Sequence, residues 1–218
     1  FYKSFAKVVV IDHHRRDDDF PKNALLTYIE SGASSASELV TEVLQYQNEQ
    51  HQKMSKVEAS IALAGISVDT KNFSKGTTTR TFEAASFLRS QGADNELIKN
   101  LLATEFDKYK KVNEIVLNAE FHDHVAIGIG LYRKMYDNVT TAKAADTLLD
   151  MVGVVASFTI VNHENGYVAI SARSSGDYNV QRVMEKLGGG GHFNNAAAQV
   201  YDKTPAEVKE HLLTIINK

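Results

Sequence analysis

A carboxylate and two imidazoles directly follow the first apolar run of the chain. Residues 7–11 read Lys-Val-Val-Val-Ile, and Asp12, His13 and His14 come next. Imidazole and carboxylate groups together suit divalent transition metals. In open α/β sheets, reactive groups gather at the carboxyl ends of the strands. The tripeptide is therefore a candidate metal or acid–base site, with an exposed strand end that carries two ordinary histidines as the alternative.

A further carboxylate, Asp69, follows the short apolar stretch of residues 65–68. It lies where a secondary-structure element is expected to end, and it can supply a second oxygen ligand to the same metal ion. Asp-Thr pairs are also common in turns, where the aspartate caps a loop. Asp69 is thus a second candidate ligand, with a loop cap as the equal alternative.

Four consecutive glycines, residues 188–191, precede His192. Such a run is entropically costly and suits a segment whose backbone approaches a ligand or adopts positive φ. Its bare N–H groups can bind phosphate oxygens. The helix predicted over residues 180–187 ends here, so its dipole does not favour an anion, and His192, other backbone donors or Arg173 must contribute. A flexible loop is the alternative.

Arg173, Ser174 and Ser175 end another predicted strand. A guanidinium group followed by two hydroxyls suits contacts with a phosphate or a nucleobase. A solvated strand end explains the same segment equally well. The spacing of His122 and His124 also resembles a ligand pair, but their charged surroundings favour a solvated face.

Composition restricts the classes of function. The 218 residues carry a formal net charge of −3 and include no cysteine. This charge argues against a long nucleic acid as partner, and disulfides and cysteine–zinc sites are excluded. No run approaches the roughly 20 apolar residues of a membrane span, so no membrane contact by this chain is expected. A predicted buried strand begins almost at once, without Met or a signal peptide, which indicates a piece of a longer protein.

The order of predicted elements indicates two domains of the α/β class. Residues 1–103 are expected to alternate strand and helix around a parallel sheet. Residues 121–218 are expected to form a smaller mixed α/β domain, and the charged residues 104–120 a helical connector. Strands are predicted over residues 7–11, 125–131, 154–161 and 167–172, and helices after Ser35, Ser55 and Thr204 and over residues 79–92 and 141–153.

Four motifs, taken in order, resemble those of the DHH–DHHA1 phosphoesterases. They are Asp12-His13-His14, Asp69-Thr70, Arg173-Ser174-Ser175, and the glycine run with His192. The resemblance extends over the whole chain. The sequence around the glycine run is similar to one branch of that family, the cyclic-di-AMP phosphodiesterases of Gram-positive bacteria. In that branch a membrane segment, a PAS domain and a degenerate GGDEF domain come first. The resemblance therefore implies a cytoplasmic catalytic domain of a membrane-anchored protein.

The resemblance also implies an activity and roles for residues. It implies a manganese-dependent phosphodiesterase that hydrolyses cyclic-di-AMP to linear 5′-pApA at a site with two Mn²⁺ ions. His13 and Asp69 would bind one metal ion, His14 would face the scissile phosphate, and Asp12 would orient a neighbouring group. The active cleft would lie between the two domains. The groups implied to hold the nucleotide are Arg173, Ser174, Ser175, Gly189, Gly190, Gly191 and His192.

One part of the family pattern has no counterpart in residues 1–11. In the family, a His-x-x-x-Asp-x-Asp segment and another aspartate precede Asp-His-His and bind the other metal ion. We therefore expect an N-terminally truncated DHH domain that holds one Mn²⁺ or none. Its exposed sheet edge would favour a homodimer. The alternatives are a nanoRNase or pAp phosphatase of the same family, and a nucleotide-binding module without catalysis.

Overall fold

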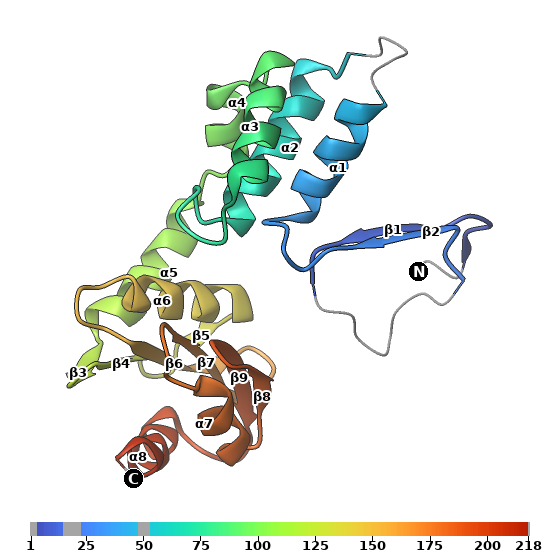
Figure 1. The fold of residues 1–218 in the computed structure, drawn as a ribbon. Helices are drawn as coiled ribbons and strands as arrows, with labels where there is room; N and C mark the ends of the chain where they lie inside the picture. Colours follow the sequence, from blue (N-terminus) through green and yellow to red (C-terminus); the bar gives the residue numbers. More distant parts are fainter. Residues whose placement is uncertain (1–3, 15–22, 48–52, 218) are drawn as a thin grey trace. The chain divides into compact units, whose positions relative to one another are not determined.

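The computed structural model describes residues 4–14, 23–47 and 53–217 and divides the chain into unit 1, residues 1–103, and unit 2, residues 104–218 (Figure 1). In unit 1, two short strands pair in parallel and four helices follow them. The elements are β1 (Val9–Asp12), β2 (Leu26–Ile29), α1 (Ala36–Tyr46), α2 (Lys56–Asp69), α3 (Thr79–Ser90) and α4 (Asn95–Leu101). The parallel pairing confirms the predicted α/β class. The predicted alternation of strand and helix is wrong, because the four helices succeed one another among the described residues.

Helices α1 and α2 of unit 1 begin after the predicted capping residues. The side chains of Ser35 and Ser55 accept hydrogen bonds from the backbone N–H groups of Glu38 and Glu58. These bonds satisfy donors that a helix start would otherwise leave unpaired. Gly92, with a φ of 97°, follows α3 as predicted. A buried apolar cluster joins the helices and includes Ala59, Leu63, Ile66, Ala84 and Leu88.

An ion-pair cluster ties β2 to the helices. Arg80 on α3 donates from Nε to Glu42 of α1 at 2.7 Å, and its guanidinium also binds Glu30, which follows β2. The guanidinium of Arg80 and the hydroxyl of Tyr28 lower the pKa of the Glu30 carboxyl. The cluster fixes the carboxyl end of β2, and through the strand pairing it supports the end of β1.

Unit 2 is built on a seven-stranded mixed sheet with the order β3-β4-β6-β7-β9-β8, and β5 pairs with β6 outside this path. The pairs β4–β6 and β5–β6 are parallel, and the others are antiparallel. The elements are α5 (Phe106–Leu117), β3 (Glu120–His122), β4 (Val125–Ile129), β5 (Met135–Tyr136), α6 (Asn138–Leu149), β6 (Ala156–His163), β7 (Val168–Ser174), α7 (Val180–Lys186), β8 (Gly190–His192), β9 (Asn195–Val200) and α8 (Pro205–Ile216). Three predicted strands are confirmed as β4, β6 and β7.

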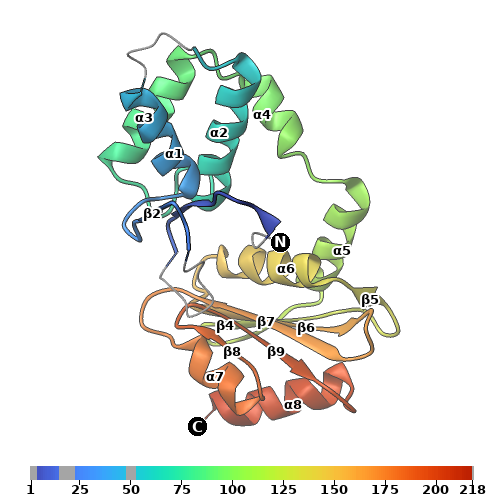
Figure 2. The same cartoon turned by 90° about the vertical axis from the view of Figure 1, so that its right-hand side faces the viewer.

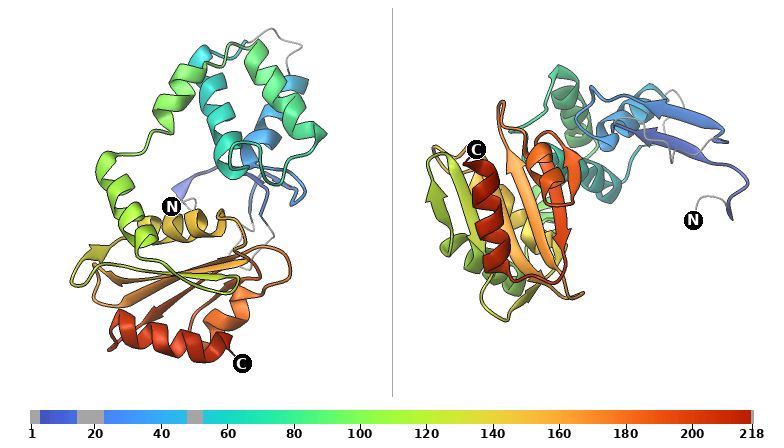
Figure 3. Two further views of the ribbon diagram at one scale, coloured as in Figure 1. Left: turned by 90° about the vertical axis from the view of Figure 1, so that its left-hand side faces the viewer. Right: turned by 90° about the horizontal axis from the view of Figure 1, so that it is seen from below.

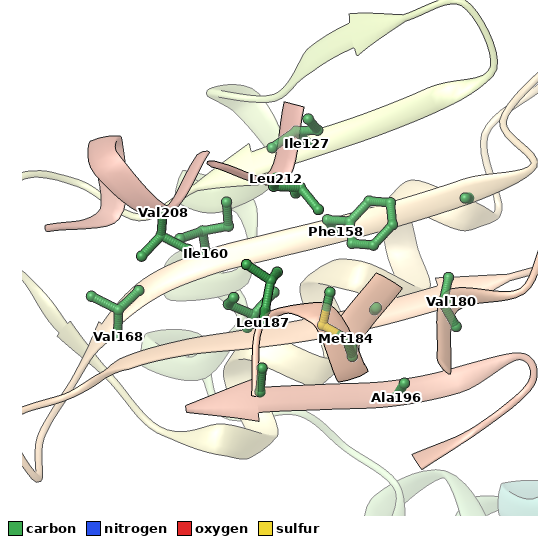
Figure 4. Close-up of a cluster of buried hydrophobic side chains, with 14 residues drawn as sticks. Ile127, Phe158, Ile160, Val168, Val180, Met184, Leu187, Ala196, Val208 and Leu212 are labelled. Carbon is green, nitrogen blue, oxygen red and sulfur yellow. The ribbon is translucent and has the colours of Figure 1, made fainter. Parts of the chain in front are cut away.

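Helices cover both faces of this sheet. Figure 2 shows α6 on one face and α7 and α8 on the other, and the right-hand view of Figure 3 shows α7 and α8 in front of the strands. Under α7 and α8 lies the main apolar core, where Phe158 and Ile160 of β6 meet Met184 and Leu212 (Figure 4). The segment expected to be a connector contains α5, which contacts α6 and β4. No helix in the described ranges is long and apolar enough to cross a membrane.

Two buried hydroxyls hold α6 at a fixed position along β6. Ser157 donates to the carbonyl of Ala145 at 2.7 Å, and Thr159 donates to the carbonyl of Thr141 at 2.8 Å. The helix begins three residues earlier than predicted, because the side chain of Asp137 accepts a hydrogen bond from the N–H of Thr140. The position of α6 matters because the helix forms one wall of the pocket described below.

Candidate functional site

The first candidate site lies at the carboxyl end of β1. The strand ends at Asp12, and His13 and His14 follow it. Nε2 of His13 lies 3.6 Å from Oδ2 of Asp69, the last residue of α2, and the two side chains are 19% and 41% exposed. The structure thus brings together the two residues predicted to bind one metal ion. A ring nitrogen and a carboxylate oxygen that converge in this way suit a divalent transition metal.

The fit to a metal ion is partial. No group of three or more His, Cys, Asp or Glu side chains forms a possible metal site within the described ranges. His13 and Asp69 therefore supply two ligands, fewer than the four to six that divalent metals commonly take.

Asp12 orients His14 and not His13. Its Oδ1 accepts hydrogen bonds from the backbone N–H of His14 at 3.1 Å and from Nδ1 of that ring at 2.7 Å. These bonds, the backbone one foremost, lower the pKa of the Asp12 carboxyl. Because Nδ1 is occupied, Nε2 is the nitrogen that His14 offers to another molecule. The His14 side chain is 76% exposed, and its ring centroid lies 4.4 Å from that of His13.

The second candidate site is a pocket of about 630 Å³ in unit 2. Its floor is one face of the β7–β9 ladder, and α6 contributes Asn138 and Ala142 to a wall. Tyr201, Gly188 and Gly189 complete the rim. The cross-strand pairs of the floor are Ala169–Gln199, Ser171–Ala197 and Arg173–Asn195.

Arg173 is the charged residue among the described residues that line this pocket. Its Nε lies 3.3 Å from Oδ1 of Asp146 on α6, and its Nη1 donates to the carbonyl of Ala172 at 3.0 Å. The side chain is only 15% exposed. A guanidinium held in this way presents a fixed positive charge, which suits a phosphate group.

The glycine run is partly a strand, so the alternative of a flexible loop is wrong for Gly190 and Gly191. Gly190 and Gly191 belong to β8, which pairs with β9. A Cβ on Gly189 would lie 2.1 Å from the carbonyl oxygen of Ala197, and a Cβ on Gly191 would lie 2.6 Å from Cα of Ala196. A Cβ on Gly190 would meet nothing within 4 Å. Close backbone approach within the protein therefore explains Gly189 and Gly191.

The other residues predicted to hold the nucleotide lie outside the lining of the pocket. Ser174 is buried, and its hydroxyl donates to the carbonyl of Tyr178 at 2.6 Å. Ser175 is exposed, and its N–H donates to the carbonyl of Val155 at 2.9 Å. His192 is exposed at the end of β8. Of the predicted set, the structure brings Arg173 and Gly189 to the pocket.

Sequence reasoning missed four polar residues that line the pocket, namely Asn138, Asn195, Gln199 and Tyr201. Three of them lie at alternate positions from residue 195 to residue 201, with Ala197 between. Alternate residues of a strand share one face. This alternation was the available signal, and the three alanines of residues 196–198 obscured it.

Comparison with known proteins identifies the class. Residues 2–66 match the DHH family N-terminal domain, and residues 124–218 match the DHHA1 domain. The chain therefore belongs to the DHH–DHHA1 phosphoesterases, as the resemblance implied. A crystal structure of an exopolyphosphatase-related protein from Bacteroides fragilis shares the fold, with a TM-score of 0.80 and 21% identity over 95% of this chain and 63% of that one.

Similar sequences carry more specific names. The chain is 50% identical, over 96% of its length, to the cyclic-di-AMP phosphodiesterase GdpP of Geobacillus thermodenitrificans. It is 46% identical, over 98% of its length, to the cyclic-di-AMP phosphodiesterase PdeA of Listeria monocytogenes. It spans 32% and 33% of those two proteins, about a third of their length. A bifunctional oligoribonuclease and PAP phosphatase, NrnA of Bacillus subtilis, is 26% identical over 94% of this chain and 66% of its own length.

Proposed function

We propose that this chain is the catalytic region of a phosphodiesterase that hydrolyses cyclic-di-AMP to linear 5′-pApA. The observation that carries the reaction class is the convergence of His13 and Asp69 beside His14 at the end of β1. The substrate is proposed from the relatives named cyclic-di-AMP phosphodiesterases, which are 44–50% identical to this chain.

The proposed cofactor is Mn²⁺, bound through Nε2 of His13 and a carboxylate oxygen of Asp69. Nitrogen and carboxylate donors together suit divalent transition metals, and the choice of Mn²⁺ rests on the family resemblance. A divalent metal supplies Lewis acidity and an activated water when it is bound at such a site. The described residues offer two donors, so the remaining ligands, and those of a second Mn²⁺, lie outside this pair.

His14 is the group proposed to move a proton. In the reaction, the oxygen of water adds to phosphorus, the P–O3′ bond breaks, and the departing 3′ oxygen takes up a proton. His14 can deliver this proton from Nε2, because its Nδ1 is bound to Asp12. The Asp12 carboxylate stabilises the imidazolium and fixes the orientation of the ring.

Arg173 is proposed to bind a phosphate of the nucleotide in the pocket of unit 2, with backbone groups near Gly189 at the rim. Ser174, Gly190 and Gly191 would then contribute by shaping the strand ends around the pocket. Ser175 and His192 are exposed at those strand ends and are proposed as additional polar contacts. We further propose that the chain is a cytoplasmic domain of a membrane-anchored protein and that it forms a homodimer. Both proposals rest on the family resemblance.

Incubation of this chain, joined to the upstream metal-binding segment that the family pattern implies, with Mn²⁺ and cyclic-di-AMP, followed by chromatography, tests the activity. We expect formation of pApA. The rate should fall at least about a hundredfold in His13→Ala and in Asp69→Ala. In His14→Ala, kcat should fall more than the affinity for the substrate. Cleavage that does not need metal, or that survives both ligand substitutions, would contradict the proposal.

The second candidate function is that of a nanoRNase or pAp phosphatase, favoured by the similarity to NrnA over 66% of that protein. Comparing initial rates on cyclic-di-AMP, linear pApA and pAp separates the two activities. The phosphodiesterase is expected to prefer the cyclic substrate. Tight binding of cyclic-di-AMP without turnover under any metal condition would instead indicate a binding module.

A further inference from the structure

The pocket of unit 2 has two chemically different ends. Arg173 lies at one end, and the Ala169–Gln199 pair lies at the other. Arg173 lies four residue steps along β7 from Ala169, which is about 13 Å at the usual rise per residue. Between the ends the floor carries only the small side chains of Ser171 and Ala197. A single nucleotide can therefore lie along the floor with its phosphate and its base at opposite ends.

The amide of Gln199 is held between two tyrosines. Its Nε2 donates to the hydroxyl of Tyr167 at 3.4 Å, and its Oε1 accepts from the hydroxyl of Tyr201 at 3.3 Å. Each amide atom has a capacity of two hydrogen bonds, so one N–H and one lone pair stay available. This adjacent donor and acceptor complement N7 and the N6 amino group of adenine, whereas guanine presents two acceptors there.

Tyr201 offers an aromatic surface at the same end. Its side chain lines the pocket and is 60% exposed. Its ring centroid lies 5.7 Å from that of Tyr167, which in turn stacks on His163 at 4.3 Å with an interplanar angle of 7°. The Tyr201 ring therefore contacts Tyr167, whose own position is fixed by stacking on His163. Exposed aromatic rings of this kind bind nucleobases by stacking.

We propose that Gln199 and Tyr201 form a base subsite that selects adenine. In this subsite Tyr201 stacks on the base, Gln199 binds its N6–N7 edge, and the attached phosphate points toward Arg173. The inference rests on the proposed function, because it assigns an orientation and a base preference to the nucleotide in that pocket.

The test is calorimetric binding of cyclic-di-AMP and cyclic-di-GMP to the full chain, which does not depend on turnover. Gln199→Ala is expected to reduce the ratio of the two affinities by about tenfold, the effect of one bidentate base contact. Tyr201→Leu is expected to lower the affinity for both ligands by about tenfold. Tyr201→Phe is expected to retain the stacking of the ring on the base. Tyr132→Leu is the matched control, because Tyr132 is 85% exposed and lies outside the pocket lining.

Arg173→Ala separates the failure of this inference from that of the proposed function. One outcome would overturn the base subsite alone. In it, Arg173→Ala weakens the binding of both ligands, Gln199→Ala leaves the affinity ratio unchanged, and Tyr201→Leu binds both ligands as the wild type does. The phosphate site at Arg173 would then stand. If Arg173→Ala also leaves binding unchanged, the pocket is not the nucleotide site. The affinity ratio is insensitive to partial misfolding, since a misfolded fraction lowers the binding stoichiometry and leaves the dissociation constants of the folded fraction unchanged.

Discussion

Replacing single glycines of the run at residues 188–191 tests why the run exists. Gly189→Ala would place a Cβ 2.1 Å from the carbonyl oxygen of Ala197 and 2.6 Å from Cα of Ala198. Ordinary contact begins at 3.4 Å, so the backbone must move by about 1.3 Å (3.4 minus 2.1 Å). Gly190→Ala is the matched control, because its Cβ would enter open space and its φ is not in the left-handed region.

The magnitude follows from the clash. Overpacking of a well-packed segment costs about 1–3 kcal/mol. In a unit of the size of residues 104–218, each kcal/mol shifts the melting temperature by about 3–6 °C. We therefore expect Gly189→Ala to lower the melting temperature of unit 2 by about 3–18 °C. Gly190→Ala should leave it unchanged or raise it slightly, because alanine reduces the entropy of the unfolded chain.

Differential scanning calorimetry of the full chain measures both variants, and hydrogen exchange at the β9 amides locates the change. Exchange should accelerate at Ala197 and its neighbours in Gly189→Ala only. Equal destabilisation by both substitutions, or none by Gly189→Ala, would refute the view that this glycine is required by the packing of β9. The run would then be explained by ligand contact alone.

Three further predictions concern ion pairs. The ammonium group of Lys56 foremost, and then two backbone N–H groups, lower the pKa of Asp94 to about 2. The stability that Asp94 contributes is therefore present above its unfolded pKa of 3.8 and is lost as the pH falls through about 2. The difference in melting temperature between the wild type and Asp94→Asn should shrink over this pH range. Asp146→Asn should weaken binding of cyclic-di-AMP several-fold by releasing Arg173, with rescue by Asp146→Glu, and unchanged affinity in calorimetry would exclude this positioning role. Arg80→Met should destabilise unit 1 by about 1 kcal/mol in urea unfolding, a value reduced by solvent screening because its side chain is 39% exposed.

The elements that were predicted correctly carry their signals locally. Ser35, Ser55 and Thr204 begin helices because each side chain binds a backbone N–H three residues later. Five strands among the described residues, β2, β3, β5, β8 and β9, were not predicted, and β8 and β5 show the physical reasons. Glycine has no intrinsic preference for strands, so the segment at Gly190 becomes a strand only through pairing with β9. The two residues of β5 are too few to show any alternation.

The candidate site was predictable where its residues adjoin or end an element. Asp12, His13, His14 and Asp69 are recognisable from residue type and position, and the structure places His13 beside Asp69. Which histidine Asp12 contacts depends on side-chain geometry, which no sequence pattern determines. The residues of the pocket floor come from β7 and β9, and only the register of these two strands shows that they share a face.

The hydroxyls of Ser157 and Thr159 have a consequence for the kinetics of binding. Both are fully buried, and each holds α6 by a carbonyl that lies one helical turn from the other. Sliding the helix along β6 would strand two polar groups away from water, at a cost of about 1–3 kcal/mol each. The wall of the pocket is thus preorganised, and a ligand that enters it incurs little ordering entropy. Association with unit 2 is then a single bimolecular step, with affinity differences among ligands expressed mainly in their dissociation rates.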